Sequence, residues 1–481
     1  MTAPTPSTEM DFDDSYPILA AMRRSHPLKV RRWKRAHRRY RTFADRRVRP
    51  IALEVDRRSR QDHDHLNGEF CRQAAREKML SVTIPPLFGG QGGDMIELAI
   101  LLEELCAACT GLGNVIGAHY LGYAGLGAGL HVDLLARISR EIVDGEARGE
   151  PVLVSFAITE PAAGSDVEDE ELLKRARVGT TARRVEGGFL LNGQKVFISD
   201  GHLAAWHVTT AYRDRNDPLR SAVGMMVRTG MEGLSIPKHE RKMGQGACPA
   251  SVLQFDDCFV PDALVLSDPE DGVSFMERVL FTLGTSRVGV SAIGTGCARG
   301  ALERAVATAG TEQRKGRRLI EEQWVQQILA EMLCNVMAAR ALTLQAAIAE
   351  ADQGLISLMV NPVFDPLQRM IPQVFLDAPL FQKTFRSRAM SSVLRHRMRK
   401  IDLRCRQRVQ GTSSAAKVKA TDLAMTNANL ALEIAGAAGL EQSSGVEKFF
   451  RDAKLLQIYE GTNQINRKHV FDTLIARSTT L

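Results

Sequence analysis

The sequence predicts an α+β protein of several domains, in which a small β-domain lies between two helical regions. Three observations indicate this order. Apolar residues recur at helical spacing before residue 150, short β-prone runs with turn signals follow, and the helical period returns after residue 271. The length of 481 residues is sufficient for such a division. We place the domains at 1–41 (a basic N-terminal arm), 42–150 (helical), 151–270 (the β-domain) and 271–481 (a helical bundle).

The first helical domain is predicted from the apolar spacing along 96–105, which follows Pro-Gly punctuation at 84–93. Cys106 and Cys109 form a CxxC pair within this pattern. No second pair accompanies them, so we interpret them as part of a packed helix face rather than as a metal or redox site.

The β-domain is predicted from an apolar, β-prone run at 152–158 and from the stretch 184–199. The latter reads as strand, Gly-Gly turn, strand, Asn-Gly turn, strand, and an Asn-Gly step between apolar runs is a strong hairpin signal. Further short strands are expected near 208–210, 224–227 and 252–255. Many short strands in so few residues favour a small, barrel-like domain.

The bundle is predicted from segments such as 325–336, whose apolar residues trace one face of a long helix. A Pro-bearing and then Arg-rich stretch at 354–411 is predicted to be an insertion. Gly294, Gly296 and Gly300 come close to a dinucleotide-binding fingerprint. Their last spacing is one residue too long and no strand precedes them, so a nicotinamide cofactor is not indicated.

Composition restricts the compartment and the partners. No run approaches the ~20 apolar residues of a membrane span, and eight scattered cysteines favour a reducing cytoplasm over a disulfide framework. The formal charge of +7 is unevenly distributed, because 23–49 carries thirteen Arg and Lys residues against one acid and 383–408 carries ten against one. Two such segments suit an anionic partner, and a merely solvated basic face is the alternative.

Four separated strings carry the functional signal. They are Ile-Pro with Gly-Gly-Gln-Gly at 84–92, Phe-Ala-Ile-Thr-Glu-Pro-Ala-Ala-Gly-Ser-Asp at 156–166, Leu-Asn-Gly-Gln-Lys-Val-Phe-Ile-Ser-Asp at 191–200, and Gln-Ile-Tyr-Glu-Gly-Thr-Asn-Gln-Ile at 457–465. In these strings the sequence resembles the acyl-CoA dehydrogenase family of flavoenzymes, over about residues 42 to 475. The resemblance implies a helical domain, a β-domain and a four-helix bundle, with FAD between the last two, in a homodimer or homotetramer.

The reaction of that family removes two hydrogens across the α,β carbons of a fatty-acyl thioester and reduces the flavin. Glu460 matches the family's catalytic base, and Tyr459 and Gly461, which flank it, are assigned to the substrate site. A carboxylate with an ordinary pKa near ~4.3 is a weak base for a carbon acid, so we expect substrate binding to desolvate Glu460 and raise its pKa. Some relatives carry the base at the position of Ser286, where serine cannot serve.

Other residues match cofactor and substrate positions. Thr159 and Ser199 match hydroxyls that bond the edge of the flavin ring, and Phe197 takes a position often held by tryptophan over the ring. Ser165 matches a contact to the phosphopantetheine arm, and Arg287 an arginine near the base. The resemblance assigns further FAD contacts to Phe156, Ile158, Arg314, Gly436, Thr462 and Gln464.

Two departures from the family pattern concern the cofactor. Glu312 stands where an arginine usually reaches the FAD pyrophosphate across a subunit interface, and we expect Arg314 or Lys315 to replace it. Glu433 stands where glutamine is common. A carboxylate near a pyrophosphate is unfavourable, so these two departures bear on cofactor affinity and on the oligomer interface.

The resemblance implies an electron-transfer flavoprotein as the electron acceptor of this acyl-CoA dehydrogenase. Two alternatives stay open. One is an acyl-CoA oxidase, which would pass electrons to oxygen. The other is a non-catalytic acyl-CoA-binding or membrane scaffold, which the intact Glu460 disfavours.

The two basic segments suggest one more partner. Apolar and aromatic residues alternate with arginines over 372–408, as in an interfacial amphipathic helix, and the segment 23–49 contains Trp33 and Tyr40. We therefore expect peripheral association with an anionic membrane, with docking of an acidic acyl-carrier protein and plain solvation as alternatives. Nucleic acid is not indicated, because no recognition fold accompanies the charge.

Overall fold

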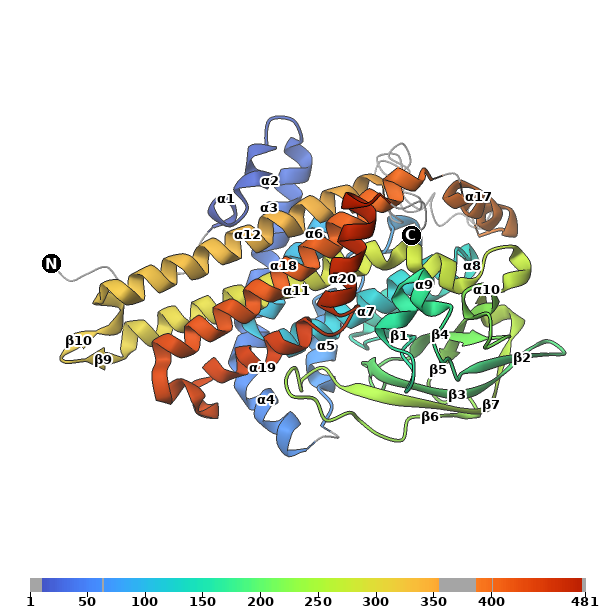
Figure 1. Ribbon diagram of the computed structural model, residues 1–481, viewed down its shortest axis with the longest axis horizontal. Helices are drawn as coiled ribbons and strands as arrows, with labels where there is room; N and C mark the ends of the chain where they lie inside the picture. Colours follow the sequence, from blue (N-terminus) through green and yellow to red (C-terminus); the bar gives the residue numbers. More distant parts are fainter. Residues whose placement is uncertain (1–10, 63–64, 354–385, 400, 478–481) are drawn as a thin grey trace.

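The structure is a computed structural model that describes residues 11–62, 65–353, 386–399 and 401–477 (Figure 1). Its elements follow the predicted order of helical, β and helical regions, which confirms the predicted fold class. The helices of the N-terminal region are α1 (Phe12–Ser15), α2 (Pro17–Ala21), α3 (Pro27–Phe43), α4 (Ala52–Gln61), α5 (Gly68–Arg76), α6 (Met95–Ala108), α7 (Thr110–Ala128) and α8 (Val132–Arg148).

Helix α3 crosses the boundary that separated the basic arm from the first domain. It packs against α6, and Trp33 and Tyr40 are buried in this contact. The indole N–H of Trp33 donates to Asp94 at 3.1 Å, and the Tyr40 hydroxyl donates to Glu97 at 3.0 Å. The expectation that these two rings face a lipid surface is therefore wrong for this structure, because both fill the core beneath α3.

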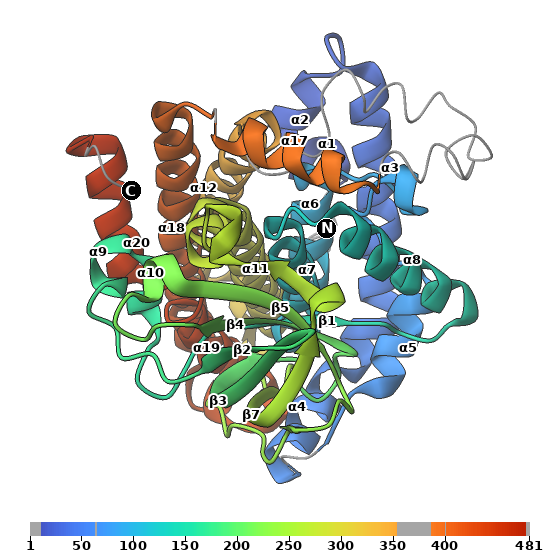
Figure 2. The ribbon, with the colours of Figure 1, turned by 90° about the vertical axis from the view of Figure 1, so that its right-hand side faces the viewer.

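The β-domain is an eight-stranded sheet in the order β6-β7-β3-β2-β4-β5-β8, with β1 paired to β4. Most neighbours are antiparallel, while β1 and β2 run parallel to β4. Figure 2 shows the sheet below α7 and α11. The strands are β1 (Val154–Ala157), β2 (Thr181–Val185), β3 (Gly188–Ser199), β4 (Trp206–Tyr212), β5 (Ala222–Arg228), β6 (Leu234–Ser235), β7 (Ala250–Pro261) and β8 (Val265–Ser267), with the short helices α9 (Glu170–Leu173) and α10 (Pro218–Ser221) between them.

The prediction of a hairpin turn at the Asn-Gly step is wrong. Asn192 and Gly193 lie inside β3, at an irregularity where the register with β7 shifts. The Asn192 amide is held by Asp257 of β7, and a Cβ on Gly193 would lie 2.6 Å from the Cα of Thr180. The dipeptide therefore serves a bulge and a close backbone approach, two other uses of glycine in strands.

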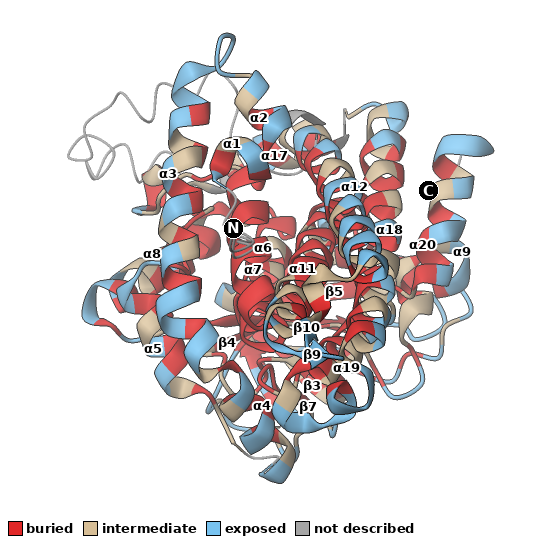
Figure 3. Cartoon of the chain, turned by 90° about the vertical axis from the view of Figure 1, so that its left-hand side faces the viewer, coloured by how far each residue is buried: buried red, intermediate tan, exposed pale blue. Residues whose placement is uncertain are grey.

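The C-terminal region is built on three long helices, α11 (Phe275–Thr311), α12 (Gln323–Gln353) and α18 (Leu403–Ala435), with the shorter α19 (Val446–Leu456) packed on α11 and α18. Figure 3 shows their facing sides buried and their outer sides exposed. Within the described residues, one helix, at 323–351 in α12, is long and apolar enough to cross a membrane. Half of its most apolar window is buried in the protein, which is also the pattern of a core helix. The remaining elements are α17 (Arg388–Arg399), α20 (Asn463–Val470) and the two-stranded pair β9 (Gln313–Arg314) and β10 (Arg317–Arg318).

The three glycines that resembled a dinucleotide fingerprint lie in the middle of α11. A Cβ on Gly296 would lie 2.5 Å from the carbonyl oxygen of Glu103, and one on Gly300 2.5 Å from that of Ala107, both on α6. A Cβ on Gly294 would lie 3.1 Å from the backbone of Ala420 on α18. These glycines permit close helix packing and do not form a phosphate loop.

The predicted insertion at 354–411 is only partly described. Residues 354–385, which carry the aromatic part of its proposed amphipathic helix, lie outside the described residues. Helix α17 follows, and its apolar residues Leu394 and Met398 are buried. Residues 403–411 are the first turns of α18 and belong to the bundle, so the insertion ends before residue 403. Because α17 turns these apolar residues inward, the described part of this segment offers charge to a membrane and no continuous apolar face.

Candidate active site

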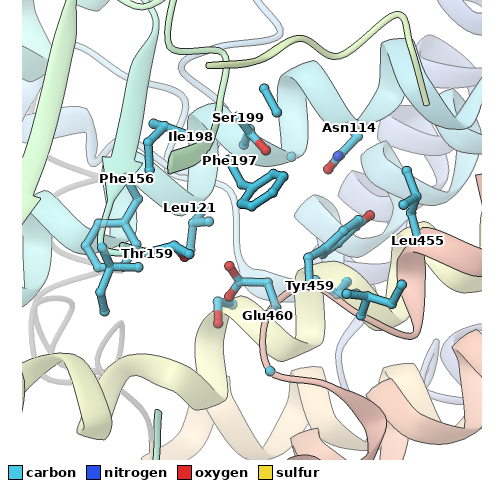
Figure 4. Close-up of a pocket in the computed structure, with 18 of the residues that line it drawn as sticks. Asn114, Leu121, Phe156, Thr159, Phe197, Ile198, Ser199, Leu455, Tyr459 and Glu460 are labelled. Atoms are coloured by element: carbon cyan, nitrogen blue, oxygen red, sulfur yellow. The ribbon is translucent and has the colours of Figure 1, made fainter. Parts of the chain in front are cut away.

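A cavity of about 800 Å³ lies where α6, α7, α11 and the β-domain meet the loop that follows α19. Figure 4 shows Phe197 and Glu460 entering it from opposite sides, with Tyr459 beside them. The cavity brings together motifs that are far apart in the sequence. Nine predicted site residues line it: Phe156, Ile158, Thr159, Ser165, Phe197, Ser199, Tyr459, Glu460 and Gly461.

The β-domain supplies one wall from the ends of β1 and β3. The carbonyl of Thr159 accepts a hydrogen bond from the N–H of Val196 at 2.9 Å, which ties the chain after β1 to β3. The pairing of β3 with β7 is irregular between Lys195 and Ile198, and Phe197 there has a φ of 57°. This bulge turns the Phe197 ring out of the sheet, where it is 59% exposed. An apolar ring with this exposure inside a cavity offers a surface for a flat ligand.

The opposite wall is a tight loop between α19 and α20. Glu460 and Gly461 both have left-handed backbone conformations, with φ of 54° and 72°. The side-chain amide of Asn466 donates to the carbonyl of Glu460 at 3.2 Å and to that of Gly461 at 2.9 Å, while Lys417 Nζ donates to Gly461 at 2.7 Å. A Cβ on Gly461 would lie 2.7 Å from Glu168 Oε2 and 2.8 Å from Ile465 Cγ2, and with the positive φ this close approach favours glycine at the position.

The electrostatics of this loop favour a base. Burial raises the pKa of Glu460 to about 7, and the negative charge of Glu168 acts in the same direction. A hydrogen bond with Ser286 and the positive charges of Arg287 and Lys417 oppose this increase. Glu460 is thus poised near neutral pH, where a general base is most effective. Ser286, the position at which some relatives carry the base, lies beside the same carboxylate.

Two charged residues at this site, Glu168 and Lys417, were missed by the sequence analysis. Glu168 lines the cavity at the end of the 3-10 turn Ser165–Glu168, and burial raises its pKa. Lys417 is fully buried on α18 beneath the loop. In the sequence, Glu168 could have been noticed as an acidic residue just after the Gly-Ser-Asp string. Lys417 could have been noticed as a lysine among small residues on an otherwise apolar helix face.

Five predicted site residues lie outside the cavity. Arg287 is fully buried behind it, and Thr462 caps the N-terminus of α20 through its side chain. Gln464, Gly436 and Arg314 are exposed. Figure 1 places β9, which carries Arg314, at the far end of the long helices from the β-domain. The FAD contact of Arg314 was expected across a subunit interface, and all five assignments stay predictions.

The CxxC pair of the N-terminal region lies among packed helices. Cys106 is buried in α6 and Cys109 at the junction with α7, and burial raises the pKa of both thiols, which suits packing rather than reactivity. The part of the chain that the structure describes contains no cluster of three or more His, Cys, Asp or Glu side chains able to hold a metal.

Comparison with protein families gives three consecutive matches. Residues 34–128 match the N-terminal domain of acyl-CoA dehydrogenases, residues 155–258 the middle domain, and residues 276–361 and 368–475 the C-terminal domain. The first match begins within α3, eight residues before the boundary expected from the sequence.

Individual proteins agree with these matches. The chain is 28% identical over 430 residues to the probable acyl-CoA dehydrogenase FadE25 of Mycobacterium tuberculosis, covering 89% of this chain and 91% of the relative. Among solved structures, butyryl-CoA dehydrogenase of Megasphaera elsdenii superposes with a TM-score of 0.71 at 22% identity, over 92% of this chain and 98% of the other. A glutaryl-CoA dehydrogenase of Mycobacterium smegmatis in complex with FADH2 gives 0.69 at 18% identity, over 92% and 94%.

Proposed function

Since the chain belongs to the acyl-CoA dehydrogenase family of FAD-dependent oxidoreductases, we propose that it removes the α-proton and the β-hydrogen of an acyl-CoA with an apolar acyl group. Glu460 is the base in this proposal. The observation that carries it is the placement of a half-buried carboxylate, with its pKa raised to about 7, opposite an exposed aromatic ring in one cavity.

The residues of the cavity fit an isoalloxazine ring. The exposed ring of Phe197, with Phe156 and Ile158, offers an apolar surface of the kind a flat ring covers, and Thr159 and Ser199 add hydroxyl groups to the same wall. When bound there, FAD supplies the acceptor for the hydride that leaves the β-carbon. Phe197, Thr159 and Ser199 would hold it, while the other residues of the site act on the substrate.

The protein's part in the reaction is to hold and move one proton. The Glu460 carboxylate accepts the α-proton, and its raised pKa makes that transfer less unfavourable than it is to an ordinary glutamate. The loop hydrogen bonds from Asn466 and Lys417 keep the carboxylate in place, because each fixes a carbonyl within one residue of it. In line with the family resemblance, the backbone N–H of Glu460 would donate to the thioester oxygen.

The acyl group would lie against the helices of the first domain. Leu98, Leu102 and Leu121 line that side of the cavity together with Val290 and Ile293 of α11. Aliphatic walls favour an aliphatic chain, since each buried methylene contributes roughly 0.8 kcal/mol.

The test is flavin bleaching with a series of saturated acyl-CoA thioesters from butyryl to palmitoyl. Purified protein should carry oxidised FAD, and its visible absorption should bleach anaerobically with at least one thioester. Glu460→Gln keeps the shape of the side chain and should keep FAD, but should bleach about 10³-fold more slowly or worse, because general-base catalysis typically contributes factors of 10²–10⁴. Glu441→Gln, an exposed acid outside the cavity, is the control. Bleaching by Glu460→Gln at the wild-type rate would place the base elsewhere.

The electron acceptor is a separate part of the proposal. We assign an electron-transfer flavoprotein to this role, in line with the family resemblance, and the acyl-CoA oxidase alternative predicts a different product. Stoichiometric hydrogen peroxide during turnover in air would favour the oxidase. Turnover that needs an added electron-transfer flavoprotein would favour the dehydrogenase.

Contact of segments 23–49 and 383–408 with an anionic membrane keeps mainly electrostatic support, since Trp33, Tyr40, Leu394 and Met398 are buried and Val393 is the one large apolar side chain of α17 described as exposed. Sedimentation with vesicles at low salt tests it. Equal pelleting with neutral and anionic vesicles would remove the idea.

A further inference from the structure

A group of buried charges lies behind Glu460, and what we infer from it rests on the proposed role of Glu460 as the base. Three charged groups face this carboxylate from three separate elements: Glu168 at the end of the 3-10 turn, Arg287 on α11 and Lys417 on α18. Ser286 adds a hydroxyl from α11. The base therefore has one negative and two positive neighbours, and its charge depends on how those neighbours pair among themselves.

Arg287 pairs with Glu168 rather than with the base. Its guanidinium is fully buried, with Nη2 donating to Glu168 Oε2 at 3.4 Å and Nη1 donating to Ser414 Oγ at 3.0 Å. Its Nε has no hydrogen-bond partner among the described residues. Glu168 thus draws the positive charge of Arg287 away from Glu460, and at the same time adds a negative charge of its own.

Lys417 acts from the other side. It is fully buried, and its Nζ donates to the carbonyl of Gly461 at 2.7 Å and to Asn463 Oδ1 at 2.8 Å. These bonds hold the loop that carries the base and place an ammonium group behind it. Burial lowers the pKa of Lys417 to about 7, while the carboxylates Glu168 and Glu460 favour its charged form.

The charged residues that surround Arg287 and Lys417 are paired with partners of their own. Asp169 faces Arg287 but is paired with Lys468 at 2.7 Å. Asp422 faces Lys417 but is paired with Arg467 at 2.6 Å. His469 also lies against Asp169, at 3.5 Å. The balance at the base is therefore set by the inner group, Glu168, Arg287 and Lys417.

We propose that Glu168 and Lys417 are positioning residues for Glu460 that act in opposite directions, Glu168 by holding Arg287 away from the base and Lys417 by fixing the base loop with a positive charge. Glu168 keeps the base protonated to higher pH, whereas Lys417 favours its ionised form. This arrangement keeps a strong base available without requiring a fully apolar pocket around it.

The proposal is tested by measuring how two variants shift the pH dependence of flavin bleaching, because it predicts shifts in opposite directions. The rate of anaerobic flavin bleaching is measured from pH 5 to 9 with butyryl-, octanoyl- and palmitoyl-CoA, using the thioester that bleaches the wild type fastest. Glu168→Gln should move the midpoint of the rising acidic limb about one pH unit lower, and Lys417→Met about one unit higher, which are shifts typical of gaining or losing a nearby charge. One unit below the wild-type midpoint, Glu168→Gln should then bleach several-fold faster than the wild type, and Lys417→Met about tenfold slower.

Matched controls separate charge from packing. Glu441→Gln, an exposed acid outside the cavity, and Lys419→Met on the exposed side of α18 make the same charge changes without altering the cavity lining, and should leave the midpoint in place. Lys417→Arg keeps the charge and should restore a midpoint near that of the wild type. If Lys417→Met does not fold, Glu168→Gln and Lys417→Arg decide the question.

Two results would overturn the inference: a midpoint that Glu168→Gln leaves unmoved or moves upward, or shifts of both variants in the same direction. A failure of the proposed function would be visible separately, because Glu460→Gln would then still bleach the flavin.

Discussion

The hydroxyl of Ser165 accepts a hydrogen bond from the backbone N–H of Thr462 at 3.2 Å, across 297 residues of sequence. This contact joins the β-domain to the loop that carries Glu460. Ser165 also lines the cavity, where the family resemblance assigns it to the pantetheine arm of the substrate. One hydroxyl therefore lies where it can link the bound thioester to the position of the base.

Ser165→Ala should weaken catalysis without removing the cofactor. Removing one hydrogen bond costs about 1–1.5 kcal/mol of binding free energy in the transition state, which corresponds to about a tenfold decrease in kcat/KM. The FAD content should be unchanged, because Ser165 is proposed to serve the substrate and the loop. Steady-state kinetics with the preferred acyl-CoA measure the effect, and Ser392→Ala on the exposed side of α17 is the control. An unchanged kcat/KM would show that neither link matters.

The activity of the wild-type enzyme should rise with pH through about 7. Glu460 must be ionised to accept a proton, and its raised pKa leaves it protonated at pH 6. At substrate concentrations well below KM, the rate should increase about tenfold per pH unit below the midpoint and then level off. Stopped-flow bleaching measures this profile. A rate that is flat from pH 5 to 8 would mean that the base has an ordinary glutamate pKa in the free enzyme.

Phe197 should control the retention of FAD. Its ring is 59% exposed in the cavity, so covering it with a flat cofactor removes apolar surface from water. Phe197→Ala should weaken FAD binding about tenfold or more, whereas Phe197→Trp, which introduces the residue often found at this position in the family, should retain it. Fluorescence titration of apoprotein with FAD gives both affinities, and Phe259→Ala, an exposed ring on β7 outside the cavity, is the control. Equal FAD affinity in the alanine and tryptophan variants would argue against a contact with the ring.

The four sequence strings predicted the parts of the site that belong to contiguous motifs. Thr159, Phe197 and Glu460 line one cavity as expected, since each motif encodes both its residue and the local turn that presents it. Glu168 and Lys417 were not predicted, because they come together only through tertiary packing of a β-domain turn against α18.

The sequence also did not predict some features of the backbone and of helix packing. The Asn-Gly step at 192–193 has the composition of a hairpin turn, yet the packing of Gly193 on Thr180 makes it a bulge within β3. In the same way, the density of arginines in 23–49 suggested a free arm. Helix α3 packs on the core because of its few aromatic and apolar residues at helical spacing. Burying a large ring contributes more to the free energy of folding than keeping the whole helix in water, and the arginine side chains can still reach solvent from the packed helix.

Trp33 should therefore affect stability rather than membrane binding. It is 1% exposed beneath α3, and its N–H donates to Asp94. Trp33→Ala should lower the free energy of unfolding by about 3–5 kcal/mol through the cavity and the lost hydrogen bond. Thermal or denaturant unfolding measures this loss, with Leu28→Ala on the same helix, where the side chain is 76% exposed, as the control. If Trp33→Ala instead leaves unfolding unchanged and abolishes binding to anionic vesicles, the ring faces lipid and the packing of α3 on α6 is not the state in solution.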